Sequence, residues 1–105
     1  MLKAHLQTHQ FDSRALALLA EVADQKGRPS VAEKALRIAI ATDRNFTAAK
    51  AKLAAVLGRL GRPGEALDLV DELLRLQPDS VSHLVLKAAT LARMGRSEEA
   101  LDVYA

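Results

Sequence analysis

The sequence predicts an all-α fold, a right-handed α-solenoid of antiparallel helix hairpins, and three observations support that expectation. Ala and Leu, which both favour helix, make up more than a third of the 105 residues. Val, Ile and Thr together number 13, too few to supply the branched side chains of a β-sheet. The same residues also return every 34 positions with no insertion or deletion, as in stacked repeat proteins. We therefore expect a single array over residues 1–105.

The repeat is clearest at the turn inside each unit. Its three copies are Gly27-Arg28-Pro29, Gly61-Arg62-Pro63 and Gly95-Arg96-Ser97. In the same phase come Ala20, Ala54 and Ala88, then Ala32, Ala66 and Ala100, then Leu36, Val70 and Tyr104. The sequence thus divides into the end of a preceding repeat (1–12), two complete repeats (13–46 and 47–80) and a truncated repeat (81–105). Because both ends cut through a repeat, we expect a fragment of a longer solenoid.

Each unit reads as two helices joined by a short turn. Leu53, Leu57 and Leu60 follow the spacing of an amphipathic helix, and Gly61 can adopt the positive φ of a helix end. Pro63 suits the first turn of the next helix, and Pro78 ends that helix. About seven helices follow, at 2–9, 13–26, 30–42, 47–60, 64–76, 81–94 and 97–105. The short turn requires each pair to pack as an antiparallel hairpin.

Positions 4, 7, 8 and 11 of each first helix are expected to face the core. Position 7 is Leu19, Leu53 and then Lys87, whose stem we expect to be buried while its ammonium reaches water. In the truncated helix at 97–105, Leu101 and Tyr104 should pack inward. With no following repeat to cover their neighbours, we expect this carboxyl-terminal end to fray or to self-associate.

At these positions the sequence resembles the tetratricopeptide repeat, a 34-residue helix-turn-helix with a small residue at position 8, Gly at 15, Ala at 20, a large apolar residue at 24 and Pro at 32. The resemblance covers residues 13–105. It departs from the family pattern at position 4 (Leu16, Lys50, Leu84), at Arg44 and at Leu73. The resemblance implies a curved array whose first helices line a concave groove that binds protein or peptide.

On a helical wheel, positions 2, 6, 9 and 13 of each first helix lie opposite the core and therefore face this groove. They are Arg14, Leu18, Glu21 and Gln25 in the first repeat, Ala48, Lys52, Ala55 and Arg59 in the second, and Ser82, Leu86, Ala89 and Arg93 in the third. The Ala residues form a floor that a ligand backbone can approach closely. We expect a ligand carboxylate near Lys52, Arg59 and Arg93, while Glu21 and Asp24 make the other end of the groove acidic.

Chaperone-binding members of the family hold a carboxylate with Lys and Asn at positions 5 and 9 of the first repeat and Asn at position 6 of the second. Here those positions are Ala17, Glu21 and Lys52. An acid where such a clamp needs an amide argues against that binding mode.

Catalytic and cofactor motifs are not found in the sequence, so we expect no enzyme activity, cofactor or metal in this segment. His5 and His9 have a metal-compatible spacing but no evident third ligand, and His83 is expected at the surface. The acidic pairs Asp71-Glu72 and Glu98-Glu99 are expected to lie on solvated helix faces.

Charge and composition exclude several classes of partner. The net charge is +2, and three aromatic residues (Phe11, Phe46, Tyr104) cannot form a stacking platform, so we expect no nucleic acid partner. No apolar run is long enough for membrane insertion and no signal peptide is evident, which favours a cytoplasmic location. The absence of cysteine excludes disulfides and thiolate metal sites.

The sequence therefore predicts a protein–protein interaction or scaffold module. An alternative is a non-catalytic accessory region of a larger enzyme. Stretches such as Leu18-Leu19-Ala20-Glu21 and Arg62-Pro63-Gly64-Glu65 resemble the repeats that precede a sulfotransferase domain in some bacterial proteins. A phosphate-binding loop after a strand further along the full-length protein would favour the enzyme, and more 34-residue units would favour the scaffold.

Overall fold

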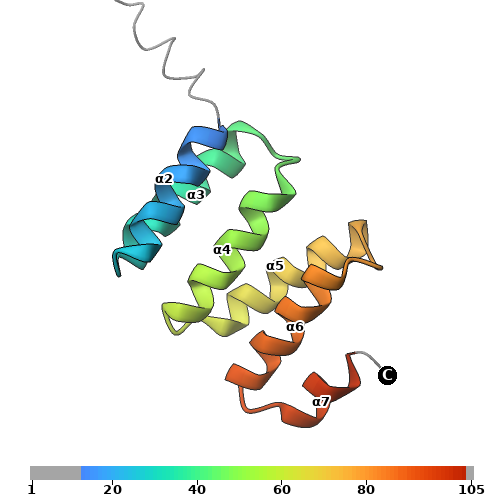
Figure 1. Ribbon diagram of the computed structural model, residues 1–105. Helices are drawn as coiled ribbons and strands as arrows, with labels where there is room; N and C mark the ends of the chain where they lie inside the picture. Colours follow the sequence, from blue (N-terminus) through green and yellow to red (C-terminus); the bar gives the residue numbers. More distant parts are fainter. Residues whose placement is uncertain (1–12, 104–105) are drawn as a thin grey trace, which may run out of the picture.

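The computed structural model describes residues 13–103, which form helices joined by short turns (Figure 1). In chain order they are α2 (Ser13–Gln25), α3 (Pro29–Thr42), α4 (Thr47–Arg59), α5 (Pro63–Leu76), α6 (Val81–Arg93) and α7 (Ser97–Asp102). The bounds of α2 to α6 agree with the sequence prediction to within one residue at each end. Helix α7 ends three residues early, and the expected helix at 2–9 lies outside the described residues.

The three glycines of the repeated turn all adopt the left-handed backbone conformation, as predicted. Their φ angles are 74° at Gly27, 79° at Gly61 and 77° at Gly95. At the second turn the amide of Arg62 donates to the carbonyl of Leu57 at 2.9 Å, and the amide of Gly61 donates to that of Gly58 at 3.2 Å. The same pair of bonds recurs at the other two turns. This Schellman motif ends each first helix and reverses the chain.

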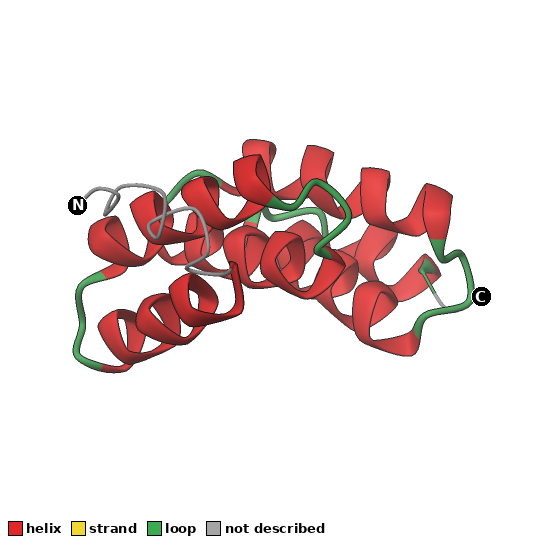
Figure 2. Ribbon diagram, turned by 90° about the horizontal axis from the view of Figure 1, so that it is seen from above, coloured by secondary structure: helices red, strands yellow, loops and turns green. Residues whose placement is uncertain are grey.

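The reversed chain makes each pair of helices an antiparallel hairpin, and successive hairpins pack against one another. Seen from above, the hairpins follow one another along the long dimension of the molecule (Figure 2). That dimension is 55 Å, against 29 and 17 Å for the other two, as expected of an open array rather than a sphere. No helix within residues 13–103 is long and apolar enough to cross a membrane.

Small side chains occupy the places where paired helices approach most closely. Ala20 and Ala54 on the first helices are 1% exposed, and Ala32 and Ala66 on the second helices are fully buried. Larger side chains, among them Leu36, fill the space between hairpins. These alanines explain why the repeat keeps a small residue at positions 8 and 20, since a leucine would push the helix backbones apart.

Two apolar side chains that the sequence placed in the core are exposed. Leu19 is 52% exposed, whereas its repeat equivalent Leu53 is 3% exposed. The side of α4 that carries Leu53 packs against the preceding α3, and no helix precedes α2 among the described residues. Leu101 is 72% exposed because it lies about 100° around α7 from Ala100, which takes the inward position. Tyr104 lies outside the described residues.

His83 is buried, which corrects the expectation of a surface residue. It is 6% exposed and its Nδ1 atom has no hydrogen-bond partner in the structure. The repeat explains the burial, since His83 is equivalent to the fully buried Ala49 and occupies an inward position on α6. Lys87 is half-buried, and its Nζ atom lies 3.0 Å from a carboxylate oxygen of Asp71 on α5. Its ammonium thus contacts the neighbouring repeat.

Candidate functional site

The first helices α2, α4 and α6 present the groove positions predicted from the repeat on one surface, here called the inner face. It comprises Arg14, Leu18, Glu21, Gln25, Ala48, Lys52, Ala55, Arg59, Ser82, Leu86, Ala89 and Arg93. Contacts between residues 31 to 35 positions apart connect the three helices across this face. Helices that are separated in sequence by a full repeat therefore lie side by side.

Most of the inner face is open to solvent. Lys52, Ala55 and Leu86 are half-buried, and the other residues of the face are exposed. Leu18 is 62% exposed, so its apolar side chain is open to contact on this face. Between α2 and α4 the face is hollowed by a cleft of about 200 Å³, which Ala20, Ala55 and Val56 line.

The charges of the inner face are paired across helices rather than separated along the groove. Lys52 Nζ lies 3.4 Å from Glu21 Oε1. Arg59 binds Asp24 through two hydrogen bonds, one of them 2.9 Å long from Nε to Oδ1. The sequence expected an acidic end at α2 and a basic end at α4 and α6. Instead, each of these two cations on α4 is paired with an acid of α2.

Arg93 extends the face to α6 without meeting a carboxylate among the described residues. Its Nη1 atom donates to the carbonyl oxygen of Gly58 at 3.4 Å, a long hydrogen bond. A Cβ atom placed on Gly58 would lie 3.4 Å from Nε of Arg93, so the glycine leaves room for the guanidinium over α4. The repeat equivalents of Gly58 are Asp24 and Ala92, and the sequence therefore gave no sign of this contact.

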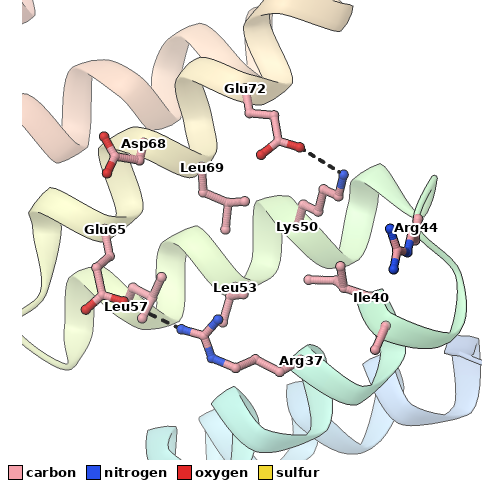
Figure 3. A pocket seen from close by; sticks show the side chains of 11 residues that line it. Arg37, Ile40, Arg44, Lys50, Leu53, Leu57, Glu65, Asp68, Leu69 and Glu72 are labelled. Atoms are coloured by element: carbon pink, nitrogen blue, oxygen red, sulfur yellow. Dashed lines mark hydrogen bonds and ion pairs between the residues drawn. The ribbon is translucent and has the colours of Figure 1, made fainter.

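The opposite side of the molecule carries a larger cleft, which the sequence prediction missed (Figure 3). This outer cleft, about 620 Å³ in volume, lies between the second helices α3 and α5 and above the first helix α4. It is lined by Arg37, Ile40, Ala41, Arg44, Lys50, Leu53, Leu57, Glu65, Asp68, Leu69 and Glu72. One signal was present in the sequence: the three acids lie on α5, and the bases Arg37 and Arg44 lie on α3 and in the turn that follows it.

An ion-pair cluster beside the outer cleft connects the second helices. Arg62, in the turn before α5, donates to Glu33 of α3 at 2.9 Å and to both carboxylate oxygens of Glu65 at 2.7 and 2.9 Å. Hydrogen bonding to Arg62 is the largest cause that lowers the pKa of both carboxyl groups below 4.5. The same bonds raise the pKa of Arg62. The turn therefore also joins two repeats.

Three of the four other acidic side chains that the sequence singled out form ion pairs, and the fourth, Glu98, is exposed. Asp71 pairs with Lys87, and Glu72 Oε2 lies 3.2 Å from Lys50 Nζ. Glu99 accepts two hydrogen bonds of 2.8 Å from Arg96, and these lower the pKa of its carboxyl group. Within residues 13–103, no cluster of three or more potential metal ligands is present. His5 and His9 lie outside that range.

Comparison with known proteins agrees with this architecture. Residues 47–72 and 81–105 match the family model described as tetratricopeptide repeat. Among solved structures, the chain resembles the crystal structure of MamA protein with a TM-score of 0.79 and 19% sequence identity. The match covers 89% of this chain and 51% of that one, so the chain spans about half the length of that protein. No curated protein matches the sequence.

At 19% identity the likeness to MamA shows the fold alone. The family match adds the sequence motif, in the same phase as the glycines of the second and third turns. Tetratricopeptide repeats generally mediate protein–protein interaction. The 34-residue motif, the helix hairpins and the matched residues together show that residues 47–72 and 81–105 carry tetratricopeptide repeats within a helical repeat fold.

Proposed function

We propose that the chain binds a peptide or an exposed protein segment on its inner face. The alignment of equivalent positions on α2, α4 and α6 by cross-helix contacts is the observation that carries this proposal. Three helices at a spacing of about 10 Å present a surface of roughly 20 Å, which accommodates about six extended residues. The binding face is therefore long enough for a short linear segment.

Small side chains allow the ligand backbone to approach this face. Ala48 and Ala89 are exposed and Ala55 is half-buried. The methyl side chain of each extends only a short distance from the helix backbone. Leu18 and Leu86 occupy the same position of the first and third repeats and provide apolar contacts at the two ends. A ligand with apolar side chains near its ends would cover both of them.

The electrostatics single out Arg93 as the first contact for a ligand carboxylate. Lys52 and Arg59 already pair with carboxylates of α2, so a ligand must compete with Glu21 and Asp24 for them. Arg93 makes only a long bond to a backbone carbonyl. Because an exposed ion pair contributes only about 0–1 kcal/mol, several such contacts must act together with the backbone approach.

The proposal is tested by removing the inner-face cations without placing new carboxylates against Glu21 and Asp24. A photo-crosslinking residue at Ala89 first captures the partner from cell extract. The triple variant Lys52→Gln/Arg59→Gln/Arg93→Gln should then bind that partner about tenfold more weakly or worse, because up to three ion pairs are lost. Its helical circular dichroism should stay unchanged.

The matched control removes cations from the second helices. Lys34 and Arg75 are exposed on α3 and α5 and make no ion pair among the described residues. The variant Lys34→Gln/Arg75→Gln should bind the partner normally. Normal binding by the triple variant, with weak binding by this control, would place the function on the second helices instead.

A further inference from the structure

The outer cleft is larger than the cleft of the inner face and carries charged side chains on both of its walls, with apolar side chains between them. Leu53 and Leu57 of α4 close its floor and are 3% and 2% exposed. Ile40 of α3 and Leu69 of α5 stand on opposite walls and are partly exposed. A ligand in this cleft would therefore cover the apolar surface that these two walls still show to solvent.

Most of the charged side chains on the walls form ion pairs, but one charged side chain at each end of the cleft remains unpaired. Arg37 lies 2.9 Å from Glu33 and 3.6 Å from Glu65, and Lys50 pairs with Glu72. The side chains of Asp68 and Arg44 make no hydrogen bond or ion pair with any residue in the described range. Figure 3 shows Asp68 near one end of the cleft, beside Glu65, and Arg44 at the other. The cleft thus has an acidic end and a basic end.

At the equivalent place in the next pair of repeats, an ion pair stands where the outer cleft has Leu53 and Arg37. The equivalent cleft, between α5 and α7, is about 390 Å³ in volume. There Lys87 replaces Leu53 and Asp71 replaces Arg37, and their 3.0 Å ion pair occupies the floor. The repeat architecture therefore produces a cleft at both places, and the residues of α3 and α4 give the larger one a leucine at its floor instead of an ion pair.

The geometry points to an amphipathic helix of a partner protein as the occupant of the outer cleft. The wall from Glu65 to Glu72 runs along α5 for about 10 Å, or two helical turns. The opposite wall runs from Arg37 on α3 to Arg44 in the turn after α3. A helix laid along that length inserts apolar side chains spaced by three or four residues between Ile40 and Leu69. A basic side chain near one end of that helix then meets Asp68, and an acidic side chain near the other end meets Arg44.

This second docking surface lies on the opposite helices from the inner face and does not depend on the proposed function. A synthetic helical peptide of about 14 residues tests it, with leucines along one face, lysines at one end and glutamates at the other. Two comparison peptides carry lysines at both ends or glutamates at both ends. Methyl resonances of Ile40 and Leu69 report binding in a nuclear magnetic resonance titration.

We expect the mixed-charge peptide to shift the Ile40 and Leu69 methyl resonances and to bind about three- to fivefold more tightly than either comparison peptide, because only it satisfies both ends. The double variant Arg37→Asp/Leu53→Lys copies the ion pair that the chain already uses at Asp71 and Lys87. It should keep its helical content and lose the peptide. Arg93→Gln, on the inner face, should bind the peptide normally.

Three results would overturn the inference. They are equal binding of all three peptides, binding that survives Arg37→Asp/Leu53→Lys, and the absence of any shift at Ile40 and Leu69. Sedimentation of the chain alone tests whether a second copy of this chain occupies the cleft. A dimer that the same double variant dissociates would assign the cleft to a second copy of this chain and not to a partner helix.

Discussion

Gly61 shows how a glycine at one fixed position of the repeat determines where the first helix ends and the chain reverses. Its φ of 79° lies in the region that side chains with a branched Cβ rarely enter. That conformation lets the amide of Arg62 reach back to Leu57 and begin the second helix in the opposite direction. A Cβ at Gly61 would meet no atom within 4 Å, so the constraint there is backbone conformation and not crowding.

We therefore expect Gly61→Val to lower the free energy of unfolding by about 1–2 kcal/mol, because the valine is forced toward the left-handed region. Chemical denaturation followed by circular dichroism measures this difference. Gly64→Ala is the matched control, since Gly64 lies in α5 with open space around it and without a positive φ. It should be neutral or stabilising by up to about 1 kcal/mol. A Gly61→Val variant as stable as wild type would contradict the account.

The burial of a residue could be predicted where equivalent positions of each repeat have the same packing neighbours. It could not be predicted where those neighbours differ between repeats. Ala20 and Ala54 are buried as their phase requires. Leu19 is exposed because burial at its position depends on a preceding hairpin and not on α2 itself. His83 was misplaced because its place at the start of a first helix suggested the surface, while the equivalent position in the second repeat, Ala49, is buried. In both cases the packing neighbours decide the burial.

At the scale of helices, the start and end signals were sufficient to predict the bounds. Each first helix ends at a glycine with positive φ, and α3 and α5 begin at a proline. These signals act within one turn of the chain, so no tertiary information was needed. The contacts that join one hairpin to the next, such as the bond from Arg62 to Glu33, were not predicted. They depend on how far each repeat is rotated against its neighbour.

The Arg62 cluster should make stability depend on pH. Because Arg62 lowers the folded-state pKa of Glu33 and Glu65, their contribution is present above about pH 5 and is lost as the pH falls through the lowered values. Replacing Arg62 by methionine should therefore lower the melting temperature at neutral pH. Once the pH lies well below the lowered pKa values, both proteins carry protonated carboxyls, so the difference between them should shrink toward zero.

Arg75→Met is the matched control for replacing an arginine by methionine in the same repeat. Arg75 lies on α5, is exposed and makes no ion pair within the described residues. Its melting temperature should differ little from that of wild type at every pH. Thermal denaturation at a series of pH values gives both comparisons. A difference between wild type and Arg62→Met that stays constant from neutral to acidic pH would show that the cluster does not stabilise the fold through these carboxylates.

For the whole molecule, the phase of the repeat predicted which residues share a face but not which charges meet. Glu21 and Lys52 were assigned to the inner face, yet expected at opposite ends of a charge gradient. Their pairing depends on the offset between α2 and α4, which a helical wheel does not contain. The outer cleft was missed for the same reason, because its walls belong to two different repeats.

The central claim is that α2, α4 and α6 together form the surface that binds the partner. The most direct test is a methyl nuclear magnetic resonance titration of the chain with the partner that the photo-crosslinking residue at position 89 identifies. We expect the largest shifts at Ala48, Ala55, Ala89 and Leu86, with the methyl groups of Ile40 and Leu69 unaffected. Shifts confined to Ile40 and Leu69, with the inner-face alanines unchanged, would contradict it.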